Sequence, residues 1–584
     1  MLAGYELPSQ EICPQFELEP TLRNLHSSEQ VESRVNNEDT ARQENIRSIK
    51  RQLAGLDAKK AVLSSLLQKL EQTSGLTPPH RVPQPTLPGP NIAIPSDTQI
   101  RLFSSLFRGR EDVFAKRWES RTGKSGYSPV CRNEWRRGLC GKPQTKCADC
   151  TNKNYVALSS DALCQHLSGK TTIGIYVLLR DETCHLLAVD FDKESWADDV
   201  AAFRMTCEKR GASCTIERSR SGKGAHAWFF FESPIQARTA RRFACALLTE
   251  TMEQRHQIGL DSYDRLFPSQ DTIPEGGFGN LIALPLQAGP AKEGNSLLVD
   301  CDLVPYPDQW GFLAEIKRLP DPVVAAIEID AARGGRLIGV RAVAMEDAEE
   351  EPWMIPPSGR KHDTPIKGPL PATLQVVSAN LLYVPSQSLP SGLINRLIRL
   401  AAFQNPEFYR AQAMRMSTFG KPRVISCAEE LEHHIALPRG CMAVLSSLAK
   451  SLGITMQIAD KRYDGQPISV SFTGTLSPSQ KESVNAVLQH EDGVVSAPTA
   501  FGKTVVAAKI IAERTVNTLI IVHRQQLLHQ WRERLAAFLN VELATIGQIG
   551  GGKKRRTKVI DVAMLQSIHR AGNVDDLVAD YGQV

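Results

Sequence analysis

Residues 184–192 read Cys-His-Leu-Leu-Ala-Val-Asp-Phe-Asp, an apolar run that ends in two acidic residues. Side chains alternate between the two faces of a β-strand, so we expect Asp190 and Asp192 on the same face at the end of one strand. Two carboxylates held this close repel each other unless a cation lies between them, and Mg²⁺ and Mn²⁺ accept such oxygen ligands. The stretch therefore predicts a buried strand that ends at a divalent-metal site. The alternative is a solvated strand end.

Apolar runs and turns continue on both sides of this strand. Residues 173–180 predict a preceding strand, joined to it by a tight turn at 181–182. Residues 213–218 and 225–231 predict two further strands, with a helical pattern before them.

A short polar loop separates the last two predicted strands. It reads Ser-Arg-Ser-Gly-Lys-Gly over 219–224, so Ser221 offers a hydroxyl, Lys223 a cation, and the glycines a close backbone approach. These groups suit a triphosphate. His226 begins the departing strand, where its ring can bond a phosphate oxygen. The alternative for His226 is a core residue whose hydrogen bonds are satisfied within the protein.

Four cysteines lie close together upstream, at positions Cys131, Cys140, Cys147 and Cys150. Thiolates at this spacing can converge on one Zn²⁺, and four of them leave no open position, so the ion would be structural. Unliganded or redox-active thiols are the alternative. Seven basic residues stand against two acidic ones in 121–150, interleaved with Tyr127 and Trp135. This strip suits a DNA backbone, although a merely solvated face has the same composition.

The ordered set of motifs resembles the archaeo-eukaryotic primase superfamily. Asp190 and Asp192 match its first motif, and Ser221, Lys223 and His226 match its second. The resemblance implies a third metal-binding aspartate before a basic, proline-containing stretch. Here that stretch is 260–270, and either Asp261 or Asp264 fits. We favour Asp264, with Arg265 beside it for phosphate.

Residues 277–287, Gly-Phe-Gly-Asn-Leu-Ile-Ala-Leu-Pro-Leu-Gln, are similar to the primase module of TOTE conflict systems, in which the primase is fused to a helicase. The resemblance covers about 97–320 and implies an RRM-like α+β core. It implies template-directed nucleotidyl transfer on DNA from NTPs or dNTPs with two Mg²⁺ or Mn²⁺ ions. The implied metal ligands are Asp190, Asp192 and Asp264. The implied triphosphate ligands are Ser221, Lys223, His226 and Arg265.

A second phosphate loop lies near the C-terminus. Residues 493–504 read Gly-Val-Val-Ser-Ala-Pro-Thr-Ala-Phe-Gly-Lys-Thr, an apolar run and a loop followed by a helical pattern. Strand, loop and helix in this order are typical of a P-loop that binds ATP through Gly502, Lys503 and Thr504. The loop resembles that of superfamily-two (DEAD/DEAH-type) helicases, and Gln480 matches their adenine-side glutamine. Ala500 replaces a glycine, which costs about 1 kcal/mol or more if its φ is positive.

The motifs that complete such a helicase are expected after residue 584. No Asp-Glu-x-His element, second lobe or arginine finger occurs in the sequence. We therefore expect a chain truncated within the first RecA-like lobe, with very slow ATP hydrolysis.

The composition is that of an ordinary multidomain globular protein. The chain has 584 residues, 69 Lys and Arg against 64 Asp and Glu, and 13 cysteines. It has no signal-peptide pattern and no run of 18 apolar residues, which argues against secretion and membrane insertion. Nine of the cysteines are scattered in apolar stretches, as buried thiols in a reducing cytoplasm would be.

Shifts in composition along the sequence divide the chain into several regions. Together they predict an α/β multidomain protein with an N-terminal coiled coil. The apolar positions Ile46, Ile49, Leu53, Leu56, Leu63, Leu67 and Leu70 follow heptad spacing, which predicts self-association or, alternatively, an amphipathic helix folded onto the chain. The predicted regions are a disordered tail 1–40, the coiled coil 41–73, a proline-rich linker 74–96, the primase-like domain 97–320 with the zinc module 131–150, a linker 321–370, an accessory domain 371–465 and the partial RecA-like lobe 466–584.

These features favour a DNA-handling enzyme, a primase-polymerase joined to part of a helicase. One alternative is a fragment of an ATP-dependent helicase or restriction-type translocase. A second alternative, from another class, is a non-catalytic adaptor that binds nucleic acid through degraded sites.

Overall fold

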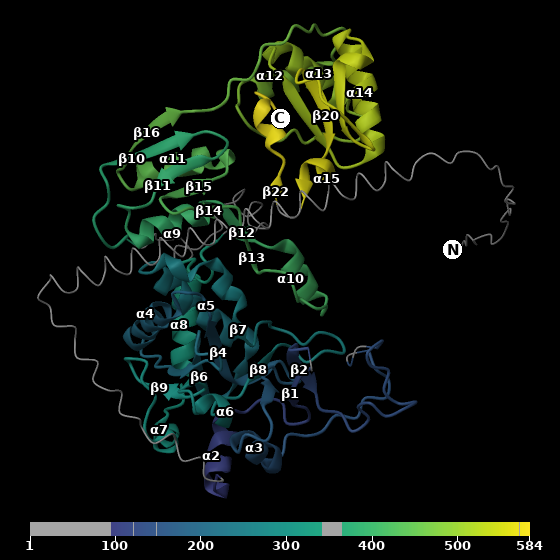
Figure 1. The fold of residues 1–584 in the computed structure, drawn as a ribbon. Coiled ribbons are helices and arrows are strands. Elements are labelled where there is room, and N and C mark those ends of the chain that lie inside the picture. Colours follow the sequence, from purple (N-terminus) through teal and green to yellow (C-terminus); the bar gives the residue numbers. More distant parts are fainter. Residues whose placement is uncertain (1–94, 121, 146, 148, 341–364, 571–572) are drawn as a thin grey trace, which may run out of the picture. The chain divides into compact units, whose positions relative to one another are not determined.

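The computed structural model describes residues 95–584 except 121, 146, 148, 341–364 and 571–572 (Figure 1). Three predicted regions lie almost entirely outside the described residues, namely the tail 1–40, the coiled coil 41–73 and the proline-rich linker 74–96. They stay predictions. The described residues contain four sheets of four or five strands, each accompanied by helices.

The strand predicted from 184–192 is present as β4 (Thr183–Phe191), inside a five-stranded antiparallel sheet. The order is β7-β4-β6-β5-β9. The other strands are β7 (Leu266–Phe267), β6 (Ala225–Gln236), β5 (Thr215–Arg218) and β9 (Leu298–Val299). Most residues of β4 and β6 are buried, as their apolar sequences predict.

Aromatic side chains pack against both faces of β6. On one face, Phe229 lies between Phe203 of α4 (Trp196–Lys209) and Phe243 of α5 (Ala237–Met252), with ring centroids 6.1 and 5.2 Å away. On the other face, Phe107, which ends α2 (Asp97–Leu106), packs 5.1 Å from Trp228. His226, the candidate triphosphate ligand at the start of β6, therefore stands on a strand packed from both sides, and β6 in turn pairs with β4, which carries Asp190.

The hairpin predicted between 173–180 and 184–192 is wrong in its pairing. A turn does join the two runs, with Glu182 at a φ of 64°. However, β3 (Ile173–Tyr176) belongs to a second sheet of order β2-β1-β3-β8. Its partners there are β1 (Ala115–Glu119) and β8 (Leu281–Ala283). The reason is that β6 and β7 already occupy both edges of β4.

The start of the predicted linker 321–370 is a helix. Residues Asp321–Arg333 form α8, which packs on α5. Val324, Ile327 and Ala331 are its buried residues, and their spacing of three and four places them on one helical face. The apolar stripe therefore gives this segment a place in the core.

Residues 371–465 contain both strands and helices, and their standing as a separate accessory domain stays a prediction. Its five-stranded sheet has the order β14-β15-β11-β10-β16. The strands are β14 (Glu429–Glu430), β15 (His434–Leu437), β11 (Leu382–Pro385), β10 (Thr373–Ser378) and β16 (Thr455–Asp460). Helices α9 (Ser391–Leu400) and α11 (Met442–Ser451) accompany them, and their buried residues belong to the same apolar core as those of β4 and β6.

The C-terminal lobe contains a sheet of order β17-β20-β18-β19. Its strands are β17 (Thr518–Val522), β20 (Ile560–Met564), β18 (Ile546–Gly550) and β19 (Lys553–Arg555), and the first three run parallel. Helices α12 (Pro478–Leu488), α13 (Lys503–Arg514) and α14 (Gln525–Leu539) complete it. The strand predicted at 493–496 is absent: Val494 is 94% exposed, and an open cavity of about 650 Å³ lies between this segment and β17.

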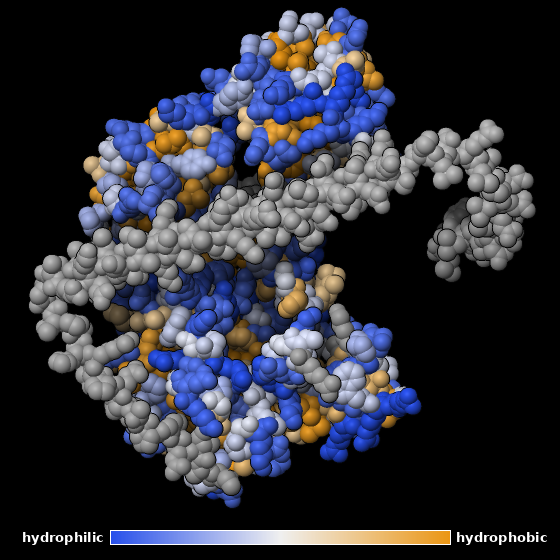
Figure 2. Space-filling model, in the orientation of Figure 1, coloured by the Kyte–Doolittle hydropathy of each residue, from blue (hydrophilic) through white to orange (hydrophobic). Residues whose placement is uncertain are grey.

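Among the described residues, no helix has the length and apolar character that a membrane crossing requires. The visible face of these residues is largely hydrophilic (Figure 2).

Candidate functional site

Three polar side chains stand in one row across the first sheet. The strand register places Asp190 of β4 opposite His226 of β6, and His226 opposite Glu217 of β5. Residues directly opposite on antiparallel strands have Cβ atoms about 5 Å apart. The Nε2 atom of His226 lies 3.7 Å from Oδ1 of Asp190, and its Nδ1 atom lies 2.9 Å from Oε2 of Glu217. The structure thus brings together two predicted site residues and a third that the motifs did not indicate.

No motif indicated Glu217, because its place opposite His226 depends on the register between β5 and β6. Burial alone lowers the pKa of His226, and the carboxylates of Glu217 and Asp190 raise it, with a net upward shift. The imidazole is therefore held in an electronegative setting that favours its charged form.

Asp192 follows the end of β4 and shares a cation with a second acidic residue. Arg265 pairs with the carboxylate of Asp192, and its Nη2 atom lies 3.1 Å from Oδ2 of Asp261. Lys193 also binds Asp261, with 2.6 Å between Nζ and Oδ1. The carbonyl of Arg265 accepts a hydrogen bond of 3.0 Å from the backbone N–H of Asp190. Asp190, Asp192 and Arg265 line one small cavity, and Asp261 reaches it through Arg265.

Asp264 is held elsewhere. Both of its carboxylate oxygens accept the backbone N–H of Arg423, at 2.9 and 3.1 Å. Burial raises the pKa of Asp264, although the bonds from Arg423 oppose that shift. Of the two predicted third ligands, Asp261 is therefore the one that shares charge partners with Asp192, whereas Asp264 anchors the segment before β7.

The loop predicted to bind a triphosphate folds back on itself beside the end of β4. The N–H of Ser219 donates to the carbonyl of Gly224, and the N–H of Lys223 donates to Oγ of Ser221 at 3.2 Å. A side chain on Gly224 would meet the carbonyl oxygen of Phe191 at 2.5 Å, so only glycine permits this approach. Ser221 and Lys223 are exposed. The loop thus presents a hydroxyl and a cation next to the acidic pair.

The side chains of this site are of the type that binds a divalent cation. Carboxylate oxygens are the ligands that Mg²⁺ and Mn²⁺ prefer. In the described part of the chain, however, no group of three His, Cys, Asp or Glu side chains already has the arrangement of a metal site. Arg265 and Lys193 neutralise Asp192 and Asp261 instead, so an entering cation would replace these ion pairs.

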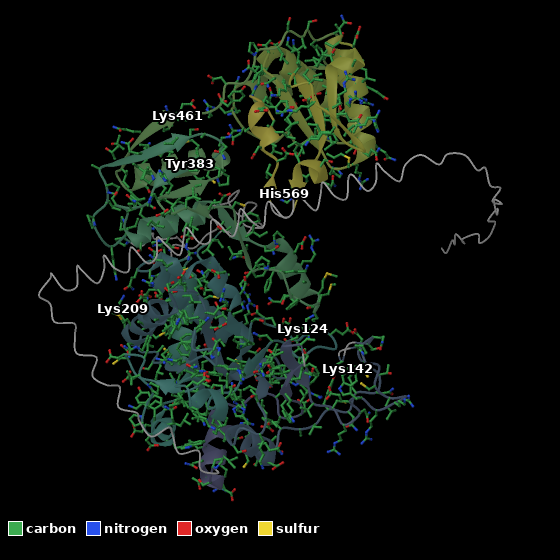
Figure 3. The ribbon with its side chains drawn as sticks, in the orientation of Figure 1. Lys124, Lys142, Lys209, Tyr383, Lys461 and His569 are labelled. Atoms are coloured by element: carbon green, nitrogen blue, oxygen red, sulfur yellow. The ribbon has the colours of Figure 1, made fainter. Side chains whose placement is uncertain are left out.

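The four predicted zinc ligands line one small cavity together with Tyr155 and Lys142. The backbone N–H of Asn154 donates to Sγ of Cys131 at 3.3 Å. Burial raises the pKa of the Cys147 thiol, and Lys142 opposes that shift. Lys142 belongs to this segment and Lys124 to the turn between β1 and β2 (Ser125–Pro129), and both are basic residues of the predicted DNA strip (Figure 3).

The P-loop of the C-terminal lobe is followed by the helix that its sequence predicts, although the strand predicted before it is absent. Helix α13 begins at Lys503 directly after Gly502, whose φ is 91°. Ala500 has a φ of 68°, so the strain expected from its β-carbon is present. Nζ of Lys503 donates to the carbonyl of Pro498 at 2.9 Å. The lysine therefore already reaches back over the loop in which phosphates would lie.

Gln480 is tied to the same loop. Its Nε2 atom donates to the carbonyl of Phe501 at 2.7 Å, and its Oε1 atom accepts the backbone N–H of Ser477 at 2.9 Å. The glutamine thus positions the loop in this structure, and its contact with adenine stays a prediction. Thr504, in the first turn of α13, is buried.

Comparisons with known proteins agree with both halves of this description. Residues 98–327 match the family model of the TOTE conflict system archaeo-eukaryotic primase domain, and residues 473–583 match that of the type III restriction enzyme res subunit. The DNA 3'-5' translocase XPB2 of Sulfurisphaera tokodaii is 42% identical over 74 residues, which are 13% of this chain and 16% of the translocase. The chain spans 16% to 23% of the length of the curated relatives that it matches.

Two solved structures are also similar. The UvsW helicase from bacteriophage T4 has 16% identity and a TM-score of 0.26, over 34% of this chain and 76% of that one. The polymerase domain of Mycobacterium tuberculosis ligase D, in complex with DNA, has 14% identity and a TM-score of 0.23, over 41% of this chain and 86% of that one.

The predicted resemblance is confirmed by the two family models, each over the segment in which its motifs were found. The chain therefore contains one segment, 98–327, that matches the archaeo-eukaryotic primase domain of TOTE conflict systems, and a second, 473–583, that matches the res subunit of type III restriction enzymes.

Proposed function

We propose that this protein is a primase-polymerase that transfers nucleotides onto a DNA-templated 3′ end and carries an ATP-binding helicase-type lobe. One observation supports it above the others. The row of Asp190 and His226 meets the hydroxyl- and lysine-bearing loop at the end of β4, next to Asp192. Carboxylates for metal ions and donors for phosphates therefore share one corner of a rigid sheet.

Each side chain has a role in this proposal. Asp190, Asp192 and Asp261 hold the divalent cations. When bound, these ions activate the attacking 3′ oxygen and stabilise the leaving pyrophosphate. Lys223, His226 and the Ser221 hydroxyl bind the triphosphate, and Arg265, once released from Asp192, is available to it as well. The guanidinium of Arg265 neutralises Asp192 and Asp261 while no cation is bound. Cations that displace it from these carboxylates would free it to bind phosphate, so metal binding and phosphate binding are coupled.

A direct assay tests the proposal. The full chain is incubated with a primed or unprimed single-stranded DNA, Mn²⁺ and labelled NTPs or dNTPs, and the products are resolved by length. We expect extension that depends on the template sequence. A protein that binds the DNA but incorporates no nucleotide under any of these conditions would instead be a non-catalytic adaptor.

The third metal ligand yields a separate prediction. Asp261→Ala is expected to lower the rate of incorporation by about 100-fold or more, because it removes a carboxylate next to the cations. Asp264→Asn is the matched variant. It is expected to lower thermal stability by replacing one of the two oxygens that accept the Arg423 N–H with an amide donor, while leaving the metal dependence of the rate unchanged. Rates are measured against Mn²⁺ concentration. A reversed pattern would make Asp264 the ligand.

We further propose that Cys131, Cys140, Cys147 and Cys150 hold one structural Zn²⁺ that shapes the basic strip for DNA. We expect about one zinc ion per purified chain by elemental analysis, and its loss in a Cys140→Ser, Cys147→Ser double variant. DNA affinity is expected to fall with the zinc. Cys301→Ser, at an exposed cysteine outside this segment, is the control. Zinc-free protein with full DNA affinity would contradict the proposal.

The remaining parts of the proposal concern the C-terminal lobe and the chain as a whole. Gly502, Lys503 and Thr504 bind the phosphates and Mg²⁺ of ATP, with Gln480 on the adenine side. The heptads in 41–73 mediate self-association, and the protein acts in the cytoplasm.

A further inference from the structure

Glu217 is a buried carboxylate one strand away from His226. Its side chain is 2% exposed, and a carboxylate at this depth is costly unless its oxygens are bonded. Three donors bond it, namely Nδ1 of His226 at 2.9 Å, Nε1 of Trp228 at 3.0 Å and Oγ of Ser296 at 3.3 Å. The sheet therefore keeps an expensive group at one defined place.

These bonds decide how the His226 ring is oriented. The same Oε2 atom of Glu217 accepts the indole N–H of Trp228, so it is an acceptor, and we assign the Nδ1–H of His226 as its second donor. The Nε2 atom consequently points the opposite way, towards Asp190 at 3.7 Å. Rotation about the last torsion of a histidine is otherwise broad. Without Glu217, the ring would sample orientations in which Nε2 leaves the site.

We propose that Glu217 is a positioning residue that acts through His226, holding its Nε2 atom where the phosphates of the incoming nucleotide bind. This inference rests on the proposed function, because it names the residue that orients one of the proposed triphosphate ligands. Outer carboxylates that orient histidines at metal sites act in the same way, and losing them costs about 10- to 100-fold in affinity or activity.

Two conservative variants of Glu217 distinguish the effect of its side-chain length from the effect of its negative charge. Glu217→Gln keeps the length of the side chain and an oxygen that accepts Nδ1–H, but it loses the charge. Glu217→Asp keeps the charge but is one methylene too short to hold Nδ1 at the observed distance. We expect the KM for nucleotide to stay within about threefold of wild type in Glu217→Gln and to rise about tenfold or more in Glu217→Asp. The DNA affinity is expected to stay unchanged in both.

A control addresses the second bond of Glu217. Trp228→Phe removes the indole donor but leaves the bond between Glu217 and His226 in place. If Glu217 served only to satisfy Trp228, Trp228→Phe would change the KM for nucleotide as much as Glu217→Asp does. We expect it to lower the unfolding temperature while the KM stays within about threefold of wild type.

The decisive measurement is a double-mutant cycle with His226→Ala. Because Glu217 acts only through His226, adding Glu217→Asp to His226→Ala is expected to change the KM by less than about twofold. Additive losses, or a Glu217→Asp variant that outperforms Glu217→Gln, would overturn the inference.

Wild-type protein that incorporates no nucleotide would contradict the proposed function instead. In that case, calorimetric titration with a nucleoside triphosphate and Mn²⁺ would still rank the wild type and the Glu217 and His226 variants by their affinity for the nucleotide. Equal affinities for all of these proteins would overturn the inference.

Discussion

Replacing Asp190 by alanine is expected to lower nucleotide incorporation by at least about 1000-fold, while DNA affinity stays within about twofold of wild type. The carboxylate of Asp190 stands in the row with His226 and lines the cavity that also contains Asp192 and Arg265. Its removal takes away a ligand that the metal ions require. The β-sheet is expected to survive, because the backbone of Asp190 makes the pairing with β6 and the bond to Arg265.

The assay measures primer extension at saturating Mn²⁺ together with DNA binding of the same preparation. Asp161→Ala is the matched control, because Asp161 is an exposed aspartate on α3 (Ser160–Leu167) whose side chain bonds only its own helix turn in this structure. Full extension by the Asp190 variant, or an equal loss in the control, would show that these carboxylates do not hold the catalytic ions.

The second large effect concerns stability. Arg241→Met is expected to lower the free energy of unfolding by about 3–5 kcal/mol, because it leaves a buried carboxylate without its cation. Arg241 is 5% exposed on α5, and its guanidinium donates to both oxygens of Asp271, at 2.6 and 2.8 Å. This pair fastens the segment that follows β7 to the main helix. Arg242→Met, next along the helix, removes a pair with Glu328 that is more exposed and is expected to cost about 1 kcal/mol or less.

The pH dependence of that effect has a definite sign. Burial raises the pKa of Asp271, but the hydrogen bonds and the charge of Arg241 lower it by more, so the net shift is downward. The stabilisation is therefore complete above the pKa of an unfolded aspartate and is lost as the pH falls through the folded-state pKa. Denaturant unfolding of wild type and Arg241→Met is compared between neutral pH and pH values below about 4. The difference in the free energy of unfolding between the two proteins should become smaller as the pH falls. A difference that does not change with pH would mean that the ion pair is not its cause.

Local pattern was sufficient for part of the candidate site. Asp190 and Asp192 were placed at the end of a strand by alternation alone, and His226 was placed at the start of the next strand by the loop before it. The P-loop was found in the same way, whereas the positive φ of Ala500 came from the structure. These features depend on a few consecutive residues, whose backbone preferences and spacing are written in the sequence.

Features that depend on distant contacts were not predictable. Alternation could not show that β3 joins a different sheet from β4, since pairing depends on which strand edges are free. Nor could it show that residues 321–333 pack on α5, because linker and helix were judged from composition over a longer window.

The sequence by itself determined which residues are candidates for the chemistry: paired carboxylates, a histidine, a phosphate loop and four cysteines, each recognisable from neighbours along the chain. Only the tertiary structure supplied a reason to propose Asp261 over Asp264, because the backbone N–H of Arg423, which lies 159 residues away from Asp264, bonds its carboxylate. It also decided that Glu217 faces His226, because only strand register brings side chains of β5, β6 and β4 into one row. Hydrogen bonds across strands act over a few ångströms in space, and no spacing along the chain encodes that distance.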